Sequence, residues 1–231
     1  MPRRFTLGLD LGQASDYSAL AVVERVGDGP EPGHHIRHLR RFPLGTGYPE
    51  VVAAVAALLA TPPLAADAIL VLDRTGVGRA VHDLFAPPKP PRAAGAWAVG
   101  SLGPPRPTTP PPVPGPVYGV TITAGDRVRR EGREYWVPKR DLVGAVSVGL
   151  QSGRLKIAPG LPEAATLAEE LQNFKVKITL AGHDSYAAGG DALDWRDRPH
   201  DDLVLAVALA VWADRHIQPR PRPTGASVDW A

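Results

Sequence analysis

The sequence predicts an α/β fold: a mixed sheet with its first three strands antiparallel and with helices on both faces. Three strand-like runs open the chain, and a turn rich in Gly, Ser and Asp separates the first two, as in an antiparallel meander. A later run is continuously apolar, which is typical of a buried parallel strand. Helical runs alternate with the later strands and are expected to cover the sheet. The first three strands are predicted at residues 5–11, 20–23 and 35–42.

The elements after the meander follow from local spacing and turn signals. Val51, Val55 and Leu59 recur at helical spacing before a Pro-Pro pair, which predicts a helix over residues 48–60. The apolar run ends in an acid and is followed by a Gly-containing turn and a second helix. Strand character then returns and leads into a charged hairpin that turns at Glu131-Gly132. The apolar run lies at 68–73, the returning strand at 117–123 and the charged hairpin at 125–137.

Five more elements complete the predicted order. Residues 141–150 show helical spacing, and residues 155–158 form a short strand closed by a proline. Residues 163–174 are amphipathic and are expected to form a helix, with another short strand at 176–180. The last helix, over residues 200–216, is strongly apolar and has acids in its first turn.

Length and composition indicate a single domain over residues 1–217. A chain of 231 residues can bury a full core, and the absence of Cys excludes disulfides, cysteine nucleophiles and thiolate metal sites. Residues 87–116 are Pro-rich and predict a flexible insertion, with a recognition peptide as the alternative, and residues 218–231 predict a disordered tail. There is no signal-peptide pattern, and the apolar helix at 203–213 is too short to span a bilayer, so no membrane is expected among the partners.

Four acids fall at comparable structural points. Asp10 interrupts the first strand, Asp73 ends the fourth, and Asp201 and Asp202 open the last helix. If the two strands are adjacent, these carboxylates cluster at one edge of the sheet and repel one another unless cations neutralise them. Oxygen ligands suit Mg²⁺ or Mn²⁺, and two such ions can support hydrolysis of a phosphodiester. The alternatives are a turn-closing role for Asp10 and helix capping by Asp201 and Asp202.

The acids are embedded in four motifs whose order along the chain is specific, although each motif alone is weak. The motifs are Asp10-x-Gly12-x-x-x-Asp16-x-Ser18, Leu72-Asp73-x-x-Gly76, Lys139-Arg140-Asp141-Leu142 and His200-Asp201-Asp202-Leu203. Together they resemble the C-terminal nuclease domain of large terminase subunits, the DNA-packaging motors of tailed bacteriophages. The resemblance covers nearly the whole chain outside the Pro-rich insertion and the tail.

This resemblance implies an RNase H-like fold and a metal-dependent endonuclease that cuts concatemeric DNA with two Mg²⁺ or Mn²⁺ ions. It implies that Asp10, Asp73 and Asp201 bind metal, with Asp202 as a fourth acid. Asp16 falls at the family's second acidic position, as a supporting ligand or as a brace of the turn. On this resemblance His200 approaches the scissile phosphate, and the alternative is a cap or a packing residue at the start of the helix.

Basic residues are expected to contact double-stranded DNA. Lys139, Arg140, Arg129 and Arg130 lie in or beside the charged hairpin, where cations neutralise phosphates or form a solvated face. The sequence has no Gly-x-x-x-x-Gly-Lys-Ser/Thr motif, so it does not encode a packaging ATPase by itself. The chain is therefore expected to be an excised domain, a split gene product or a remnant. The expected partners are a separate ATPase, a small terminase subunit and a portal, in the cytoplasm of a bacterial host.

Three other functions are compatible with parts of the pattern. A Holliday-junction resolvase shares the fold and the acid cluster but cuts four-way junctions symmetrically. An actin-like sugar kinase also has Asp-x-Gly on its first strand, but it needs a second phosphate loop and a longer chain. A non-catalytic DNA-binding or assembly module retains the fold without turnover.

Overall fold

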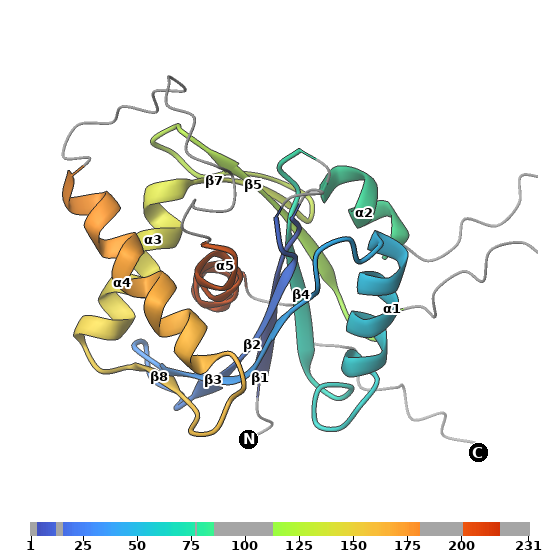
Figure 1. The fold of residues 1–231 in the computed structure, drawn as a ribbon, viewed down its shortest axis with the longest axis horizontal. Coiled ribbons are helices and arrows are strands. Elements are labelled where there is room, and N and C mark those ends of the chain that lie inside the picture. The colour runs from blue at the N-terminus through green and yellow to red at the C-terminus, as the bar shows by residue number, and fades with distance from the viewer. Residues whose placement is uncertain (1–3, 13–15, 77, 86–112, 181–200, 218–231) are drawn as a thin grey trace, which may run out of the picture.

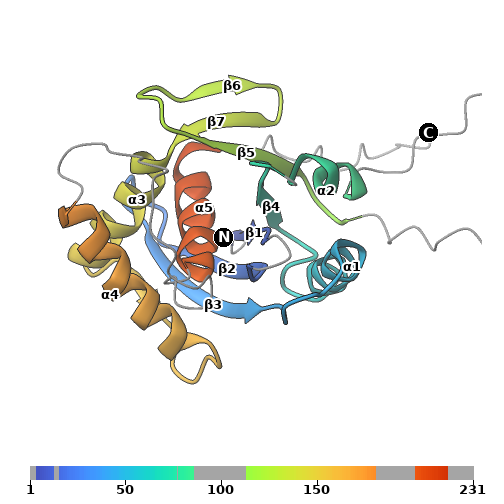
Figure 2. The ribbon, with the colours of Figure 1, turned by 45° about the horizontal axis from the view of Figure 1, so that its top comes forward.

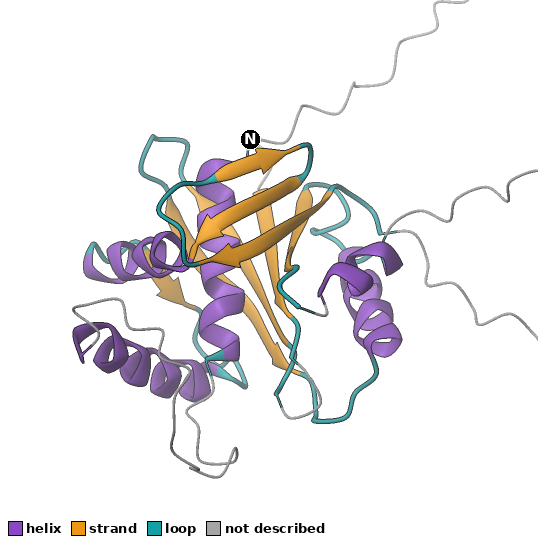
Figure 3. Cartoon of the chain, turned by 90° about the horizontal axis from the view of Figure 1, so that it is seen from above, coloured by secondary structure: helices purple, strands orange, loops and turns teal. Residues whose placement is uncertain are grey.

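A computed structural model of the chain describes residues 4–12, 16–76, 78–85, 113–180 and 201–217. The described residues form a mixed sheet of eight strands with helices on both of its faces, so the predicted α/β class is confirmed. Figure 3 shows the strands as one twisted sheet flanked by helices. Residues 87–112 of the predicted Pro-rich insertion lie outside the described residues. The whole predicted tail, residues 218–231, also lies outside them.

The antiparallel meander forms one half of the sheet. Strand β1 (Arg4–Asp10) pairs with β2 (Ala19–Val26), and β2 pairs with β3 (Gly33–Arg41), both in antiparallel register. Short strand β8 (Leu155–Ile157) extends this half by pairing in parallel with β3. The first three strands are therefore antiparallel, as predicted from the turns that separate them.

Parallel strands form the other half. Strand β4 (Ala68–Asp73) pairs with β1, and β5 (Val117–Thr123) pairs with β4, so three adjacent strands run in one direction. Strand β7 (Glu134–Pro138) continues this direction beside β5. Strand β6 (Arg129–Glu131) returns antiparallel to β7 and forms the predicted charged hairpin. The complete order is β6-β7-β5-β4-β1-β2-β3-β8.

The helices divide between the two faces of the sheet (Figure 1). Helices α1 (Tyr48–Leu59) and α2 (Gly78–Leu84) cover one face. Helices α3 (Lys139–Gln151), α4 (Ala164–Leu180) and α5 (Asp202–His216) lie on the other, with α5 between the sheet and the pair formed by α3 and α4. Each face has its own apolar cluster of buried side chains: the α1 cluster includes residues of α1 and α2, and the α5 cluster includes most of α5.

Helix α5 lies at the centre of the molecule (Figure 2). Residues 202–214, apart from Leu205, are buried, and Ala, Val and Leu make up most of them. A helix that is apolar on all sides is stable only when other elements surround it. The side chain of Trp212 is 1% exposed and contacts the ring of Tyr135 on β7 edge to face, so the helix is also fixed at its carboxyl end.

One predicted element is wrong. Residues 176–180 were expected to form a short strand because Val, Ile and Thr favour extended structure. In the structure they are the last residues of α4, which runs without interruption from Ala164 to Leu180. An existing helix gains one hydrogen bond for each added residue, whereas a new strand must find a partner edge, and the helix prevails here.

None of the helices within the described ranges combines the length and the apolar character that crossing a bilayer requires.

Alternation along two central strands determines which face their acids occupy. On β1, Leu7 and Leu9 pack in the α1 cluster, so Gly8 and Asp10 point to the α5 face. On β4, Leu72 packs in the α1 cluster and Val71 packs in the α5 cluster, so Asp73 also points to the α5 face. The two acids therefore share one face and one end of the sheet.

Candidate active site

Four carboxylates converge at the carboxyl ends of the central strands. Asp10 ends β1 and Asp73 ends β4, and these strands are parallel neighbours in which Leu9 pairs with Leu72. Asp201 directly precedes α5, and Asp202 is its first residue. The adjacency of the first and fourth strands, on which the sequence argument depended, is therefore present in the fold.

The electrostatics of Asp10 reflect this convergence. The residue is 7% exposed, and its pKa lies well above the ordinary value, first because burial disfavours the charged form. The carboxylates of Asp73, Asp202 and Asp201 raise it further, in that order. Three acids that are distant in sequence thus act on the same buried carboxyl group.

Asp73 and Asp202, two other acids of the cluster, also have raised pKa values but differ in their surroundings. Burial raises the pKa of Asp73, while its Oδ1 accepts a hydrogen bond of 2.7 Å from the backbone N–H of Thr75, which favours the charged form. Burial raises the pKa of Asp202 to about 7, with contributions from Asp201 and Asp16, while Arg41 opposes the shift. Protonation near neutral pH indicates a site that stabilises negative charge poorly without additional cations.

Two basic side chains partly compensate this charge. The Nζ of Lys139 lies 3.8 Å from Oδ2 of Asp201, and Lys139 follows directly after β7 at the same end of the sheet. The guanidinium of Arg41, at the end of β3, lies 3.9 Å from Oδ2 of Asp202. The ring of Tyr17 holds that guanidinium from one side, 3.8 Å from its centroid.

The acids at the start of α5 are not its cap. Asp201 occupies the N-cap position but makes no side-chain cap hydrogen bond. The backbone N–H groups of Leu203 and Val204 donate instead to Oε2 of Glu170 on α4, over 2.9 and 3.1 Å. The capping alternative considered from the sequence is therefore not what this helix terminus uses.

Asp16 lies beside the cluster rather than inside it. It is exposed, follows β1 in the loop to β2, and is close enough to raise the pKa of Asp202. With Gly12 and Tyr48 it lines a pocket of about 260 Å³, and the Tyr48 hydroxyl donates to the carbonyl of Gly12 over 3.0 Å. Both predicted roles of Asp16, supporting ligand and loop brace, stay predictions.

The remaining predicted residues are at the hairpin or outside the described chain. Arg129 and Arg130 lie on the exposed edge strand β6, and each guanidinium lies over an aromatic ring of β7, Trp136 and Tyr135 respectively. Arg140 donates to the backbone carbonyl of Asp126 over 2.8 Å, which links α3 to the start of the hairpin. His200 lies outside the described residues.

The donor set has the chemistry that a hard divalent cation requires. Four carboxylates supply oxygen ligands, and their mutual repulsion at Asp10 is what a cation would relieve. Within the part of the chain that the structure describes, however, no three His, Asp or Glu side chains form a group that could hold a metal ion. The residues fit Mg²⁺ or Mn²⁺ by type and charge, without forming a complete ligand set.

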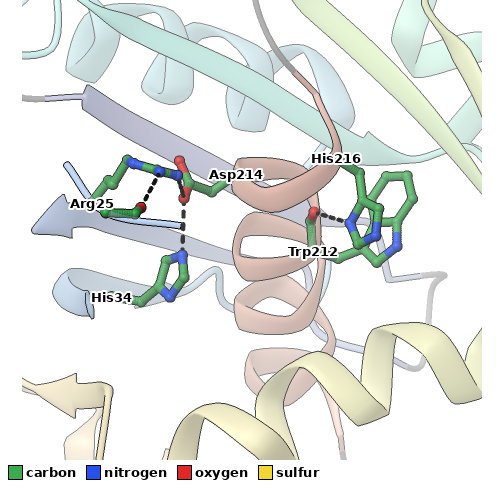
Figure 4. Close-up of polar contacts among 6 residues, drawn as sticks. Arg25, His34, Trp212, Asp214 and His216 are labelled. Carbon is green, nitrogen blue, oxygen red and sulfur yellow. Dashed lines mark hydrogen bonds and ion pairs between the residues drawn. The ribbon is translucent and has the colours of Figure 1, made fainter. Parts of the chain in front are cut away.

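A second polar cluster anchors the opposite end of α5 (Figure 4). Oδ2 of Asp214 lies 2.9 Å from Nη1 of Arg25 on β2 and 2.9 Å from Nε2 of His34 on β3. The side chains of Asp214 and His34 are 2% and 0% exposed. This buried cluster lies at the end of the sheet away from Asp10, and it fixes the helix without contributing to the acid cluster.

Sequence reasoning missed Glu170, Arg41 and Tyr17 as parts of the site. Glu170 is three residues after Leu167, which is fully buried, so helical spacing places a carboxylate on an apolar face. That unusual position was a detectable signal. Arg41 was visible only as one of three neighbouring arginines, and its contact with Asp202 depends on tertiary packing.

The raised pKa of Asp202 predicts how stability depends on pH. In EDTA the folded state binds more protons than the unfolded state between the ordinary pKa of Asp and about 7, so the carboxyl lowers the unfolding free energy as pH rises. The unfolding free energy of Asp202→Asn minus that of the parent should therefore rise by on the order of 2 kcal/mol between pH 5 and pH 8. Urea unfolding at both pH values measures it, and a difference independent of pH would contradict the assignment.

Comparison with known proteins identifies the fold. No family model and no curated protein matches the sequence. The solved structure of the large terminase nuclease from thermophilic phage G20c is similar, with a TM-score of 0.50 and 18% identity, over 90% of this chain and 81% of that chain. A human cytomegalovirus terminase nuclease domain, soaked with Mn, has a TM-score of 0.44 and 13% identity, over 90% and 82% of the two chains. The chain therefore has the RNase H-like fold of the nuclease domain of large terminase subunits.

Proposed function

We propose that the chain is a metal-dependent endodeoxyribonuclease that cuts double-stranded concatemeric DNA during genome packaging. One observation carries the proposal: Asp10, Asp73, Asp201 and Asp202 converge at the carboxyl ends of the central strands in a terminase-nuclease fold. Clustered buried acids that repel one another are unfavourable for folding, so their presence together in one site points to a functional use.

The acids would hold two Mg²⁺ or Mn²⁺ ions. Asp10, Asp73 and Asp201 are the proposed ligands, with Asp202 as a fourth. When bound, such ions lower the pKa of a water nucleophile and stabilise the leaving oxygen of a phosphodiester. The chain itself contributes a buried carboxyl at Asp10 and two nearby cations, Lys139 and Arg41, which limit the negative charge that DNA must approach.

The hairpin provides a basic surface for DNA. Arg129 and Arg130 are exposed and lie on aromatic rings, which restricts their side chains and favours phosphate contacts. The hairpin begins where β5 ends, at the end of the sheet that holds the acids. A separate packaging ATPase, a small terminase subunit and a portal are the partners that this function would require.

Removing the two hairpin arginines should weaken DNA binding rather than chemistry. Arg129→Ala with Arg130→Ala should lower affinity for duplex DNA and reduce the salt dependence of binding by roughly one to two counterions. Fluorescence anisotropy at several salt concentrations, in EDTA, measures this without cleavage. Arg154→Ala is the control. Arg154 directly precedes β8, forms an ion pair with Glu31, and lies at the end of the sheet away from the acids. Equal losses in the two proteins would contradict the proposed surface.

A substrate panel tests the function itself. The chain is incubated with a linear duplex and with a four-way junction of the same arm sequences, in Mn²⁺, Mg²⁺ or EDTA. Metal-dependent cutting of the duplex with weak sequence preference is expected. Paired symmetric cuts confined to the junction would favour a resolvase, and binding without cutting would favour a non-catalytic module.

A further inference from the structure

We propose that Glu170 is a positioning residue for the acid cluster: it caps helix α5 from a neighbouring helix, so that Asp201 and Asp202 are not required as caps. The inference rests on the proposed nuclease function and assigns a role to a residue outside the predicted ligand set. Glu170 lies on α4, 33 residues before Leu203, whose backbone N–H donates a hydrogen bond to it.

The geometry of this cap is specific. Oε2 of Glu170 accepts hydrogen bonds from the N–H groups of Leu203 and Val204, over 2.9 and 3.1 Å. Glu170 is 5% exposed and follows Leu167, which is fully buried in the core on the same helix. The carboxylate is therefore held by a packed helix rather than by a loop.

A helix terminus usually satisfies its first N–H groups with the side chain of the N-cap residue. Asp201 has that position and a suitable side chain, yet makes no such hydrogen bond. If it did, its carboxylate would fold back over the helix terminus. Because Glu170 accepts these hydrogen bonds, the carboxylates of Asp201 and Asp202 remain close enough to Asp10 to raise its pKa.

Burial raises the pKa of Glu170 to about 7, while the hydrogen bond from the Val204 N–H opposes the shift. In its ionised form the carboxyl adds negative charge at the amino end of the helix, where such charge is favoured. Its contacts fix the first turn of α5, and that turn carries Asp202. Loss of the cap should therefore allow the first turn to fray and should misplace two of the four acids. A contact that only stabilised the fold would lower the melting temperature without changing metal affinity in the folded protein.

Three substitutions separate these possibilities. Glu170→Ala removes the acceptor, and Glu170→Asp keeps a carboxyl group but withdraws it by one methylene. Glu170→Gln keeps an acceptor oxygen of the same reach. The matched control is Asp214→Asn, which weakens the buried contact with Arg25 at the other end of the same helix.

The readouts are hydrogen exchange at the Leu203 and Val204 amides, Mn²⁺ affinity by electron paramagnetic resonance, and kcat and KM for duplex cleavage. All are measured well below each melting temperature. Glu170→Ala and Glu170→Asp should lose amide protection, bind Mn²⁺ about 10- to 100-fold more weakly, and lose kcat more than KM, as expected for an outer contact of a metal site. Glu170→Gln should recover most of each effect, and Asp214→Asn should lower the melting temperature while retaining Mn²⁺ affinity.

If Glu170→Ala fails to fold, Glu170→Asp provides the same test. A Glu170→Asp protein that binds Mn²⁺ and cuts DNA like the parent overturns the inference alone. An equal loss of Mn²⁺ affinity in Asp214→Asn also overturns it, because the effect would then follow general destabilisation. A parent chain that neither binds Mn²⁺ nor cuts DNA overturns the proposed function, and this inference with it.

Discussion

Replacement of Asp73 by Asn is expected to reduce metal-dependent cleavage by roughly 10²- to 10³-fold or more, the effect of removing one preorganised charged or polar group from an active site. The substitution preserves shape and keeps an oxygen that can accept the hydrogen bond from the Thr75 N–H. It removes a negative charge from the carboxyl end of β4, beside Asp10. Rates are compared by plasmid cleavage in Mn²⁺, at matched protein concentrations.

The control for this prediction is Asp28→Asn, which neutralises an exposed acid in the turn between β2 and β3. It changes net charge by the same amount and should leave the rate unchanged. The fold of Asp73→Asn should be retained, with no loss of stability in EDTA, because burial raises the pKa of the native carboxyl and the neutral amide avoids that cost. Cutting by Asp73→Asn at the parent rate would remove Asp73 from the proposed ligand set.

Gly8→Ala should have the largest effect on stability and should also impair the site. A Cβ at Gly8 would collide with the backbone carbonyl of Ala206 on α5, and backbone atoms cannot move aside as a flexible side chain can. Overpacking of this kind costs roughly 1–3 kcal/mol or more, so a clear decrease in the urea midpoint is expected. Because β1 carries Asp10 and α5 carries Asp202, separating these elements should also reduce cleavage in the folded fraction.

Gly144→Ala is the matched control for this substitution. Gly144 lies within α3, and among the described residues an added Cβ would meet no atom within 4 Å apart from the backbone of its own helix and its chain neighbours. Ala is favoured over Gly inside a helix by roughly 0.5–1 kcal/mol, so this variant should be slightly more stable than the parent. Equal stability of Gly8→Ala and Gly144→Ala would show that the close approach of α5 to β1 is not required.

The sequence predicted the fold well because its signals are local. The continuous apolar run of β4 and the helical spacing in α1 each describe an element without reference to the rest of the chain. Residues 176–180 show the limit of such signals, since their β-branched side chains favour a strand and the preceding helix continues through them. Local preference loses where an adjacent element can simply extend.

The candidate site likewise contains residues that the sequence identifies and residues that only the tertiary fold reveals. Asp10 and Asp73 could be recognised because an acid at the end of an apolar run is costly unless it has a use. Glu170 and Arg41 reach the site only through the packing of α4 and β3 around α5, and no spacing in the sequence relates either of them to Asp202. Contacts between distant segments are set by the tertiary fold, so pattern reasoning could find the acids but not the residues that hold them.

Cleavage of supercoiled plasmid by the parent chain tests the central claim most directly. The reaction is run in Mn²⁺, in Mg²⁺ and in EDTA, with folded Asp10→Asn alongside. Nicked and linear products are predicted with metal, and none are predicted in EDTA or with Asp10→Asn. A folded parent chain that leaves the plasmid intact with both metals, or an Asp10→Asn protein that cuts as fast as the parent, would contradict the assignment of this acid cluster as a nuclease site.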